Sequence, residues 1–262
     1  LLEFVQFVGS RGYRCGRAVV NRGKQIGRNL INRRRFTKAL ALLYVNSVRT
    51  FKLTELYQPT YNPRGYFLGR KDEGKRRSED RVAFMLDGLP LGEINNYLDV
   101  GSQLGYFVFR MAENGIVSHG IEIDLVSHQY ASALSVLAGS SRTSFQHAGL
   151  TSMISRQLPR YDAISFLNVF HHIVHADGFE EADRIVKALA GRCRYFVFET
   201  GGFGEKGQHW TDALAFMGDD PLSWQQAYLE RDVGCCIMKL RAFKNHLNDE
   251  LRSVFICKSG GE

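Results

Sequence analysis

The sequence predicts an α/β fold in which a mostly parallel sheet ends in an antiparallel hairpin. Short apolar runs alternate with helical stretches from about residue 79 onward, and a turn that contains glycine follows the first of these runs. The last two apolar runs are joined by a short polar turn. Strands that alternate with helices are typical of a parallel sheet covered by helices on both faces. We expect a sheet of seven strands.

The expected strands are short and apolar. They lie at Asn96–Val100, Ser118–Ile123, Thr143–His147, Ala163–Asn168 and Tyr195–Glu199, followed by residues 233–243 and 251–258. Apolar residues at helical spacing predict helices at about 79–89, Leu104–Asn114, Val126–Ala138 and Gly178–Ala190. Because only the polar turn His246–Asp249 separates the last two strands, we expect them to pair as an antiparallel hairpin.

The chain divides by composition into a basic N-terminal extension, residues 1–78, and a domain of residues 79–262 that carries the predicted sheet. Residues 1–56 read as helical, whereas residues 57–80 contain the prolines, glycines and charges of a loop, which could serve as a lid. Residues 1–90 hold 19 Lys and Arg against 7 Asp and Glu, while residues 91–262 hold 15 against 20. The basic third suggests an anionic partner, namely phosphate, nucleic acid or a membrane surface; a solvated helical face or simple packing on the body would give the same pattern.

Composition excludes several classes of protein. No stretch of about 18 uninterrupted apolar residues is present, so we expect no membrane-spanning helix. The five cysteines are odd in number and form no C-x-x-C pair, which argues against a disulfide framework or a structural zinc site. Such cysteine usage favours a reducing, cytoplasmic location, where the basic third could also hold the protein at the inner membrane surface.

The strongest motif is the segment Tyr97–Phe107, Y-L-D-V-G-S-Q-L-G-Y-F, which runs from a strand through a turn into a helix. Ligands of open parallel sheets bind at the carboxyl ends of the strands, beside such turns. Gly101 permits a tight turn and the close approach of a ligand, and Gly105 allows close packing of helix against strand. The predicted site also includes the residues between and after them, Ser102, Gln103 and Tyr106. The helix start offers free N–H groups to a carboxylate.

A second acidic residue, Glu122, ends the next predicted strand, where its carboxylate can accept the two hydroxyls of a ribose. A dinucleotide site would use the same acid but requires the pattern G-x-G-x-x-G. Here Gln103 replaces the middle glycine. A carboxylate at Asp99 would repel a pyrophosphate, but it could hold a cationic amino-acid group. The turn therefore favours an amino-acid nucleoside over a dinucleotide.

These residues resemble motif I, (D/E)-x-G-x-x-x-G, and the ribose-binding acid of the class I S-adenosylmethionine-dependent methyltransferases. The resemblance extends over about residues 80–258 and implies a Rossmann-like fold with S-adenosylmethionine as the cofactor. It implies that Asp99, Gly101 and Gly105 line the methionine part and that Glu122, followed by Ile123, holds the ribose.

The third and fourth strands complete this resemblance. Asn168 takes the place of the polar residue that ends the fourth strand beside the cofactor. The third strand lacks the acid that usually reaches the adenine amino group. We therefore expect Gln146, or the backbone, to contact the adenine instead.

The acceptor side is expected just beyond Asn168, where His171, His172 and His175 follow the strand. One of them could act as a general base, or bind an anionic acceptor when protonated; equally, they could pack beneath the cofactor. Glu199 ends the fifth strand and is a further candidate base. We expect no metal site, because no carboxylate at ligand spacing accompanies the histidines.

The stretch V-F-H-H-I-V-H-A-D-G, the loop after Glu199 and the final hairpin resemble two groups of methyltransferases. One group methylates bacterial surface polysaccharide and includes enzymes that terminate O-antigen chains. The other methylates the terminal phosphate of RNA. The resemblance implies an oxygen acceptor on a glycan or its terminal phosphate; an RNA methyltransferase, or a binding protein without catalysis, is the alternative.

Overall fold

The computed structural model describes residues 33–44, 61, 78–244 and 250–260 of the 262. By its contacts the chain divides after Leu40, and residues 41–262 form the unit that contains the sheet. Residues 33–44 are helical, as predicted. The rest of the predicted helical segment 1–56, most of the predicted loop and the hairpin turn 246–249 lie outside the described residues. The domain boundary after residue 78 stays a prediction.

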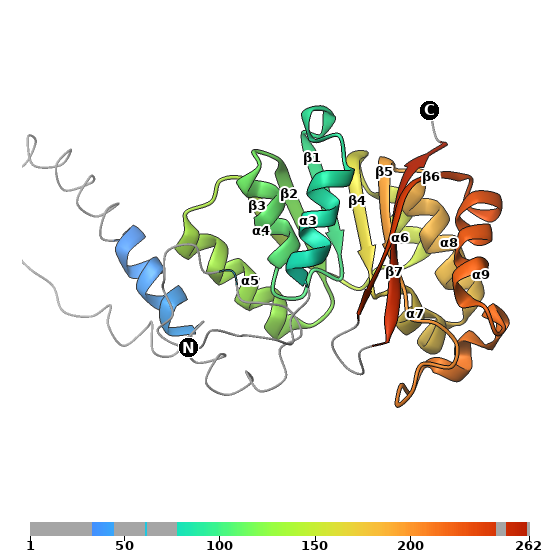
Figure 1. Ribbon diagram of the computed structural model, residues 1–262. Helices are drawn as coiled ribbons and strands as arrows, with labels where there is room; N and C mark the ends of the chain where they lie inside the picture. The colour runs from blue at the N-terminus through green and yellow to red at the C-terminus, as the bar shows by residue number, and fades with distance from the viewer. Residues whose placement is uncertain (1–32, 45–60, 62–77, 245–249, 261–262) are drawn as a thin grey trace, which may run out of the picture. The chain divides into compact units, whose positions relative to one another are not determined.

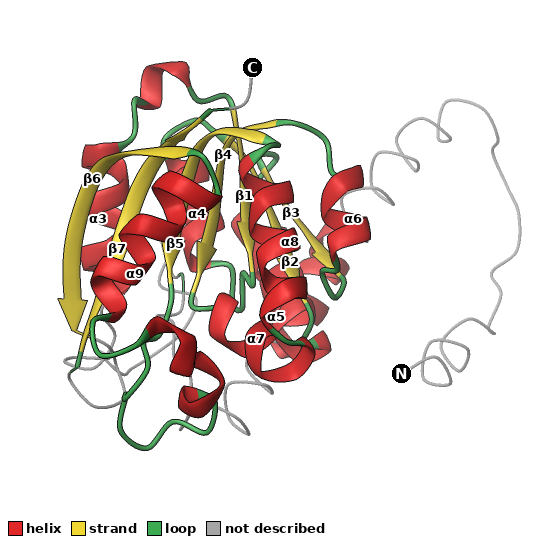
Figure 2. Ribbon diagram, turned by 90° about the vertical axis from the view of Figure 1, so that its right-hand side faces the viewer, coloured by secondary structure: helices red, strands yellow, loops and turns green. Residues whose placement is uncertain are grey.

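The sheet has seven strands in the order β3-β2-β1-β4-β5-β7-β6 (Figures 1 and 2). Their bounds are β1 Asn96–Val100, β2 Val117–Glu122, β3 Thr143–His147, β4 Tyr161–Leu167, β5 Cys193–Glu199, β6 Cys235–Lys244 and β7 Leu251–Ser259. Strands β1 to β5 pair in parallel, and β7 is antiparallel to both β5 and β6. The predicted sheet and its terminal hairpin are confirmed.

The helices cover both faces of this sheet (Figures 1 and 2). Their bounds are α3 Ser78–Gly88, α4 Tyr106–Glu113, α5 Leu125–Ala138, α6 Ser152–Gln157, α7 Phe170–Asp177, α8 Phe179–Ala190 and α9 Pro221–Ala227. The first three pack on one face, and the last four lie on the other. Short 3-10 helices occupy Leu91–Glu93 and Thr211–Met217, and a π-helical turn occupies Tyr228–Asp232. None of the helices in the described ranges is long and apolar enough to cross a bilayer.

Helix α7 is not among the helices predicted from the sequence, and it carries all three histidines that follow the fourth strand. It lies between Asn168, which has a φ of 59°, and Gly178, which has a φ of 86°. Phe170 and Val174, four residues apart, are its buried apolar contacts. A helix of eight residues gives too few repeats for its period to stand out in the sequence. The short helices α6 and α9 were missed for the same reason.

Alternation along β1 decides which side chains reach the ligand-binding edge. Tyr97 packs in the core beneath α3 and α4, while Leu98 and Val100 pack in the core beneath α8. Successive side chains of a strand point to opposite faces, so Asp99 shares the face of Tyr97. Residue 99 is therefore carried to the carboxyl end of a central strand with its carboxylate already buried, at 2% exposure.

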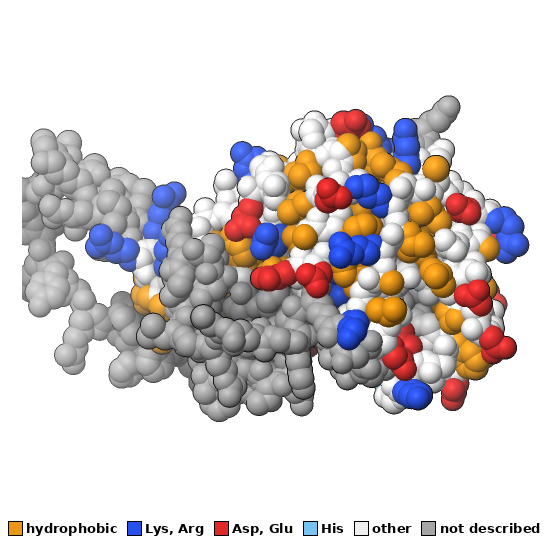
Figure 3. Space-filling model, viewed as in Figure 1, with side chains coloured by type: hydrophobic (Ala, Val, Ile, Leu, Met, Phe, Trp, Pro, Cys, Tyr) orange, Lys and Arg blue, Asp and Glu red, His pale blue; other side chains and the backbone are white. Residues whose placement is uncertain are grey.

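The described surface shows no single-signed field on the face drawn in Figure 3. Lys and Arg side chains there alternate with Asp and Glu side chains and with apolar ones. The excess of positive charge found in residues 1–90 belongs mostly to the range 1–77, of which the structure describes only residues 33–44 and 61. The proposed anionic partner of that third stays a prediction.

Candidate active site

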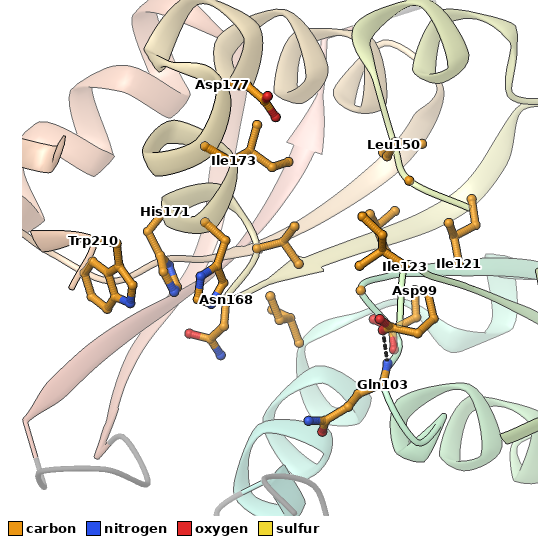
Figure 4. Close-up of a pocket in the computed structure, with 18 of the residues that line it drawn as sticks. Asp99, Gln103, Ile121, Ile123, Leu150, Asn168, His171, Ile173, Asp177 and Trp210 are labelled. Atoms are coloured by element: carbon orange, nitrogen blue, oxygen red, sulfur yellow. Dashed lines mark hydrogen bonds between the residues drawn. The ribbon is translucent and has the colours of Figure 1, made fainter. Parts of the chain in front are cut away.

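A cavity of about 820 Å³ opens at the carboxyl ends of β1, β2 and β4 (Figure 4). One end is formed by the turn after β1 and by Glu122. The other end is formed by residues of α7, by the loop residues 208–210 and by Arg252 of β7. The two ends differ in chemistry: the first carries the carboxylates of Asp99 and Glu122, and the second carries imidazole and guanidinium groups together with the carboxylate of Asp177.

Asp99 presents an unpaired oxygen to the site. The Ser165 hydroxyl donates to Asp99 Oδ1 over 2.5 Å, and the Tyr97 hydroxyl lies 2.5 Å from the Ser165 hydroxyl. Within the described part of the chain, Oδ2 is buried and has no donor. Burial raises the pKa of Asp99 to about 7, and the charge of Glu122 adds to the rise, against the lowering by the two hydroxyls. A cationic ligand would satisfy Oδ2 and restore the ionised form.

Glu122 organises the turn beside it. Its Oε2 accepts the backbone N–H of Gln103 over 2.7 Å, and its Oε1 accepts that of Asp124 over 2.7 Å. A carboxylate has about four lone-pair sites, so each oxygen can still accept a ligand hydroxyl. Asp124 in turn caps α5, because its Oδ1 accepts the N–H of Ser127. One acid thus holds the cofactor-side turn and the start of the next helix together.

The turn itself is built close to its neighbours. Gly101 has a φ of 75°, and a Cβ there would lie 2.5 Å from Val169 Cγ2. Gly105 has a φ of 79°, and a Cβ there would lie 2.5 Å from the Phe145 ring. Gln103 lines the cavity with a φ of 46°, which is uncommon for a residue with a side chain. The roles predicted for the two glycines, a tight turn and close packing, agree with these contacts.

The remaining cofactor-side residues divide into two groups. This part of the cavity has an apolar wall, which is formed by Ile123, Leu150, Ile121 and Phe107. Ser102, Gly105 and Tyr106 are not among the described residues that line it. Ser102 shapes the turn through its backbone N–H, which donates to the Ile121 carbonyl over 3.0 Å.

The expectation for Gln146 is corrected by its position. Its side chain is exposed on β3 and does not line the cavity. The cavity is lined instead by residues 148–151, which follow the strand. Since the strand ends at His147, the segment just beyond it, and not a side chain within it, reaches the ligand edge. The alternative of a backbone contact to the adenine stays a prediction, and Ala148–Leu150 are the residues beyond β3 that line the cavity.

At the second end of the cavity, several imidazole rings lie near the indole ring of Trp210. His171 and His172 line the cavity together with Gln208, His209 and Trp210. The His171 ring lies 4.2 Å from the Trp210 ring and 4.3 Å from the His172 ring, centroid to centroid. Burial lowers the pKa of both histidines, and nearby His209 and Arg252 lower it further. His175 lies on the same helix but is exposed and outside the cavity lining.

Arg252 is the site residue that the sequence analysis missed. Its Nε and Nη2 donate to the Glu205 carboxylate at 2.7–3.1 Å, and its Nη1 donates to Asn168 Oδ1 over 2.8 Å. Its guanidinium lies 5.4 Å from the Trp210 ring and lines the cavity. The signal for it was present, because a single arginine stands near the start of the strongly apolar strand L-R-S-V-F-I-C and so requires a buried partner.

Asn168 takes the predicted place at the end of β4 and lines the cavity, with its amide held between two charged groups. Its Nδ2 donates to Glu199 Oε2 over 3.1 Å, opposite the bond from Arg252 to its Oδ1. The orientation of the amide is therefore set by its neighbours before any ligand binds.

The assignment of Glu199 as a base facing the cavity is corrected. Its side chain is fully buried and is not among the described residues that line the cavity. Arg81 of α3 donates to both of its oxygens at 2.5–3.0 Å. Both oxygens are therefore occupied by the Arg81 guanidinium, and neither is directed at the cavity. Glu199 instead supports the site through Asn168.

These residues fit S-adenosylmethionine. The orphaned Oδ2 of Asp99 suits the ammonium of its methionine part, and Glu122 suits its ribose hydroxyls. The apolar wall formed by Ile123 and Leu150 suits the adenine ring.

Comparison with known proteins finds similarity to methyltransferases in sequence and in fold. No family model matches the chain. The chain is 27% identical over 152 residues to the O-antigen chain terminator bifunctional methyltransferase/kinase WbdD of Escherichia coli; these residues are 56% of this chain and 21% of WbdD. A crystal structure of WbdD shares the fold over 82% of this chain and 47% of that chain, with a TM-score of 0.65 and 22% identity. An O-methyltransferase family protein from Burkholderia thailandensis shares it over 71% of this chain and 57% of that chain, with a TM-score of 0.51 and 12% identity.

Proposed function

We infer that this chain, a class I methyltransferase related in sequence to an O-antigen methyltransferase, uses S-adenosylmethionine to methylate an oxygen of a surface glycan or of its terminal phosphate. The observation that carries this proposal is the two-ended cavity. It has the carboxylates Asp99 and Glu122 at the cofactor end, and His171, His172 and Arg252 at the other.

Asp99 and Glu122 would hold S-adenosylmethionine, which would supply an activated methyl group to the acceptor oxygen, with the electron pair of the broken carbon–sulfur bond left on sulfur. The chain contributes mainly alignment, because the cofactor is already activated. Asp99 and Glu122 fix the donor at one end of the cavity. A phosphate oxygen needs no base, whereas a hydroxyl must lose its proton, and an imidazole at the other end of the cavity is the candidate base for that proton.

An anionic acceptor suits the far end of the cavity on electrostatic grounds. Arg252 brings a permanent positive charge to that end. Glu205 contacts this guanidinium through Nε and Nη2, whereas Nη1 donates to the neutral amide of Asn168. We also propose that the basic residues of the N-terminal third hold the anionic carrier of the acceptor, or the membrane surface to which it is attached. That contact depends on charge and should weaken as salt increases.

Calorimetric titration with S-adenosylmethionine tests the cofactor half of the proposal. Wild type should bind, and Glu122→Ala should bind at least about tenfold more weakly, because a charge-assisted hydrogen bond contributes roughly 1.5–3 kcal/mol. Glu180→Ala is the control, since this glutamate is exposed on α8 and lies outside the cavity. Equal affinity of wild type and Glu122→Ala would remove the assignment of the cofactor site.

Mass spectrometry of the products tests the acceptor half. The protein would be incubated with S-adenosylmethionine and one of three acceptors: an oligosaccharide with a terminal phosphate, the same oligosaccharide without it, or a short RNA with a terminal phosphate. We expect methylation of the oligosaccharides and not of the RNA. Methylation of the RNA alone would establish the alternative enzyme, and cofactor binding without any product would favour a binding protein.

A further inference from the structure

The position of His171 determines which of its ring nitrogens carries a proton. It is the second residue of α7, with a side chain only 1% exposed. Its Nδ1 lies 3.0 Å from the backbone N of Gly201 and 3.2 Å from the Thr200 hydroxyl. Both partners belong to the loop that follows β5, so the Nδ1 side of the ring faces that loop.

A backbone N–H can only donate, so Nδ1 must accept and therefore carries no proton. Turning the ring over would place a carbon opposite the Gly201 N–H and leave a buried donor without a partner, at a cost of about 1–3 kcal/mol. The loop cannot relax easily, because a Cβ at Gly201 would already lie 2.1 Å from the Trp210 ring. In the neutral ring the proton is consequently on Nε2.

The neutral ring is also the favoured one at this place. Burial lowers the pKa of His171 well below its ordinary value, with further lowering from His172, Arg252 and His209. No carboxylate is among the causes of this shift. The Glu205 carboxylate is engaged by Arg252 and by the Gly202 N–H. A second proton on this ring would add a positive charge beside a guanidinium, and no carboxylate of the described residues is hydrogen-bonded to the ring.

We propose that His171 is a fixed neutral hydrogen-bond donor that positions the acceptor through Nε2–H. The donor contacts an acceptor oxygen other than the one that is methylated, because a hydrogen bond to the reacting oxygen would withhold its lone pair from the methyl carbon. Within the described part of the chain, Nε2 has no hydrogen-bond partner of its own, and the side chain lines the cavity. This inference rests on the proposed function, since it assigns a role within the same site.

His172 has different surroundings from those of His171. It lines the same cavity and is more exposed than His171, although its surroundings still lower its pKa, and neither of its ring nitrogens is hydrogen-bonded among the described residues. It is therefore the histidine of the pair that is free to take up the proton of a hydroxyl acceptor. The two adjacent imidazoles, which the sequence could not tell apart, would serve separate tasks.

Nitrogen NMR of the imidazole rings tests the tautomer directly, without cofactor or acceptor. Two-bond proton–nitrogen spectra of the labelled full chain would be compared with those of His171→Gln, whose missing signals identify residue 171. We expect Nε2 protonated and Nδ1 unprotonated from about pH 6 to about pH 8. A proton on Nδ1, or titration of this ring near the ordinary histidine value, would overturn the proposal.

Two substitutions test the role in catalysis. The amide nitrogen of glutamine can take the place of Nε2, whereas that of asparagine reaches only the place of Nδ1. With the phosphorylated oligosaccharide as acceptor, His171→Gln should keep kcat/KM within about tenfold of wild type, and His171→Asn should lose roughly a hundredfold, mainly through KM. An essential base at residue 171 would instead give equal losses in both variants and remove the acidic limb of the pH profile.

His175→Gln is the matched control, because it makes the same substitution on the same helix outside the cavity. Calorimetry with S-adenosylmethionine separates this inference from the proposed function. Cofactor affinity should be unchanged in the His171 variants. Failure of the wild type to bind cofactor would defeat the proposed function, whereas the ring spectra would still decide the tautomer. If His171→Asn does not fold, the spectra and the glutamine variant remain decisive.

Discussion

Asp99 and Glu122 are both acidic and lie at the same end of the cavity, yet their surroundings are opposite. Glu122 receives a backbone N–H on each oxygen, whereas Asp99 receives a hydroxyl on one oxygen and, among the described groups, nothing on the other. Hydrogen bonds to a carboxylate stabilise its charge, and burial without them opposes it. Asp99 is therefore the residue whose ionisation a cationic ligand can change.

Cofactor binding should release a proton and depend on pH. With the pKa of Asp99 raised to about 7, the carboxyl is mostly protonated below that pH and must ionise before it can pair with an ammonium. Affinity should fall by up to about tenfold for each pH unit below 7. Calorimetry in buffers of different ionisation enthalpy measures the released proton. A binding enthalpy that is the same in all buffers at pH 6.5 would contradict this prediction.

The same carboxyl should make the unliganded protein less stable as pH rises. A carboxyl whose pKa is raised by folding adds stability below its unfolded pKa of about 3.9, and that stability is lost as pH increases through the folded value of about 7. Asp99→Asn should therefore melt above wild type at pH 8, with the difference shrinking towards pH 4, while losing cofactor affinity. A variant that melts below wild type at pH 8 would argue against a buried, unfavourable charge.

At the scale of elements, the turn between β1 and α4 decides whether the cavity exists. Its first glycine approaches the residue just before α7, so two loops that are distant in sequence touch at Gly101 and Val169. Neither loop has room for an additional carbon. The turn therefore holds both the cofactor-side and the acceptor-side loops in place.

Gly101→Ala should be destabilising and should abolish cofactor binding. A side chain at a φ of 75° costs about 1–2 kcal/mol, and the contact with Val169 adds roughly 1–3 kcal/mol. Gly115→Ala is the control, because Gly115 has a φ of 86° and nothing within 4 Å of the added carbon. Urea unfolding should show the larger loss at residue 101, and Val169→Ala in the same chain should recover part of it. Equal losses at the two glycines would show that the close contact is unimportant.

At the scale of the whole molecule, one buried polar network connects α3, the ends of β4 and β5, β7 and the loop after β5. Arg81 pairs with Glu199, Asn168 bridges Glu199 and Arg252, and Arg252 pairs with Glu205. All four charged members are less than a tenth exposed. Buried charges must be paired, so this network keeps these elements in register around the cavity.

Breaking the first pair should cost stability more than cofactor affinity. Arg81→Met and Glu199→Gln should each lower the free energy of unfolding by about 3–5 kcal/mol, because each leaves one partner uncompensated in the core. The double variant Arg81→Met/Glu199→Gln should be less destabilised than the sum of the single variants. Lys239→Met, which removes the exposed pair with Asp87, should change stability much less. Additive losses in a urea-unfolding cycle would contradict the pairing.

Much of the fold could be predicted from the sequence, because it depends on patterns of residues that are close together along the chain. Strand positions agreed to within about two residues, since apolar runs bounded by turn residues identify buried strands. The glycine turn and the two acids were found because their spacing follows the strand–turn–helix unit. Gln146 was misplaced although the ends of its strand, Thr143–His147, were predicted correctly, because the cavity is lined by residues 148–151 beyond the strand and local pattern does not set the course of that loop.

The sequence by itself determined the alternation of strands and helices, the turn at Gly101 and the acid at Glu122, because each depends on residues close together along the chain. Only the tertiary structure decided that Glu199 pairs with Arg81, 118 residues away, and that Arg252 enters the cavity. It also decided that His171 and His172, adjacent in sequence, have different surroundings. Those outcomes depend on which buried charges and hydrogen-bond donors meet after the sheet has assembled, and no local pattern encodes such a meeting.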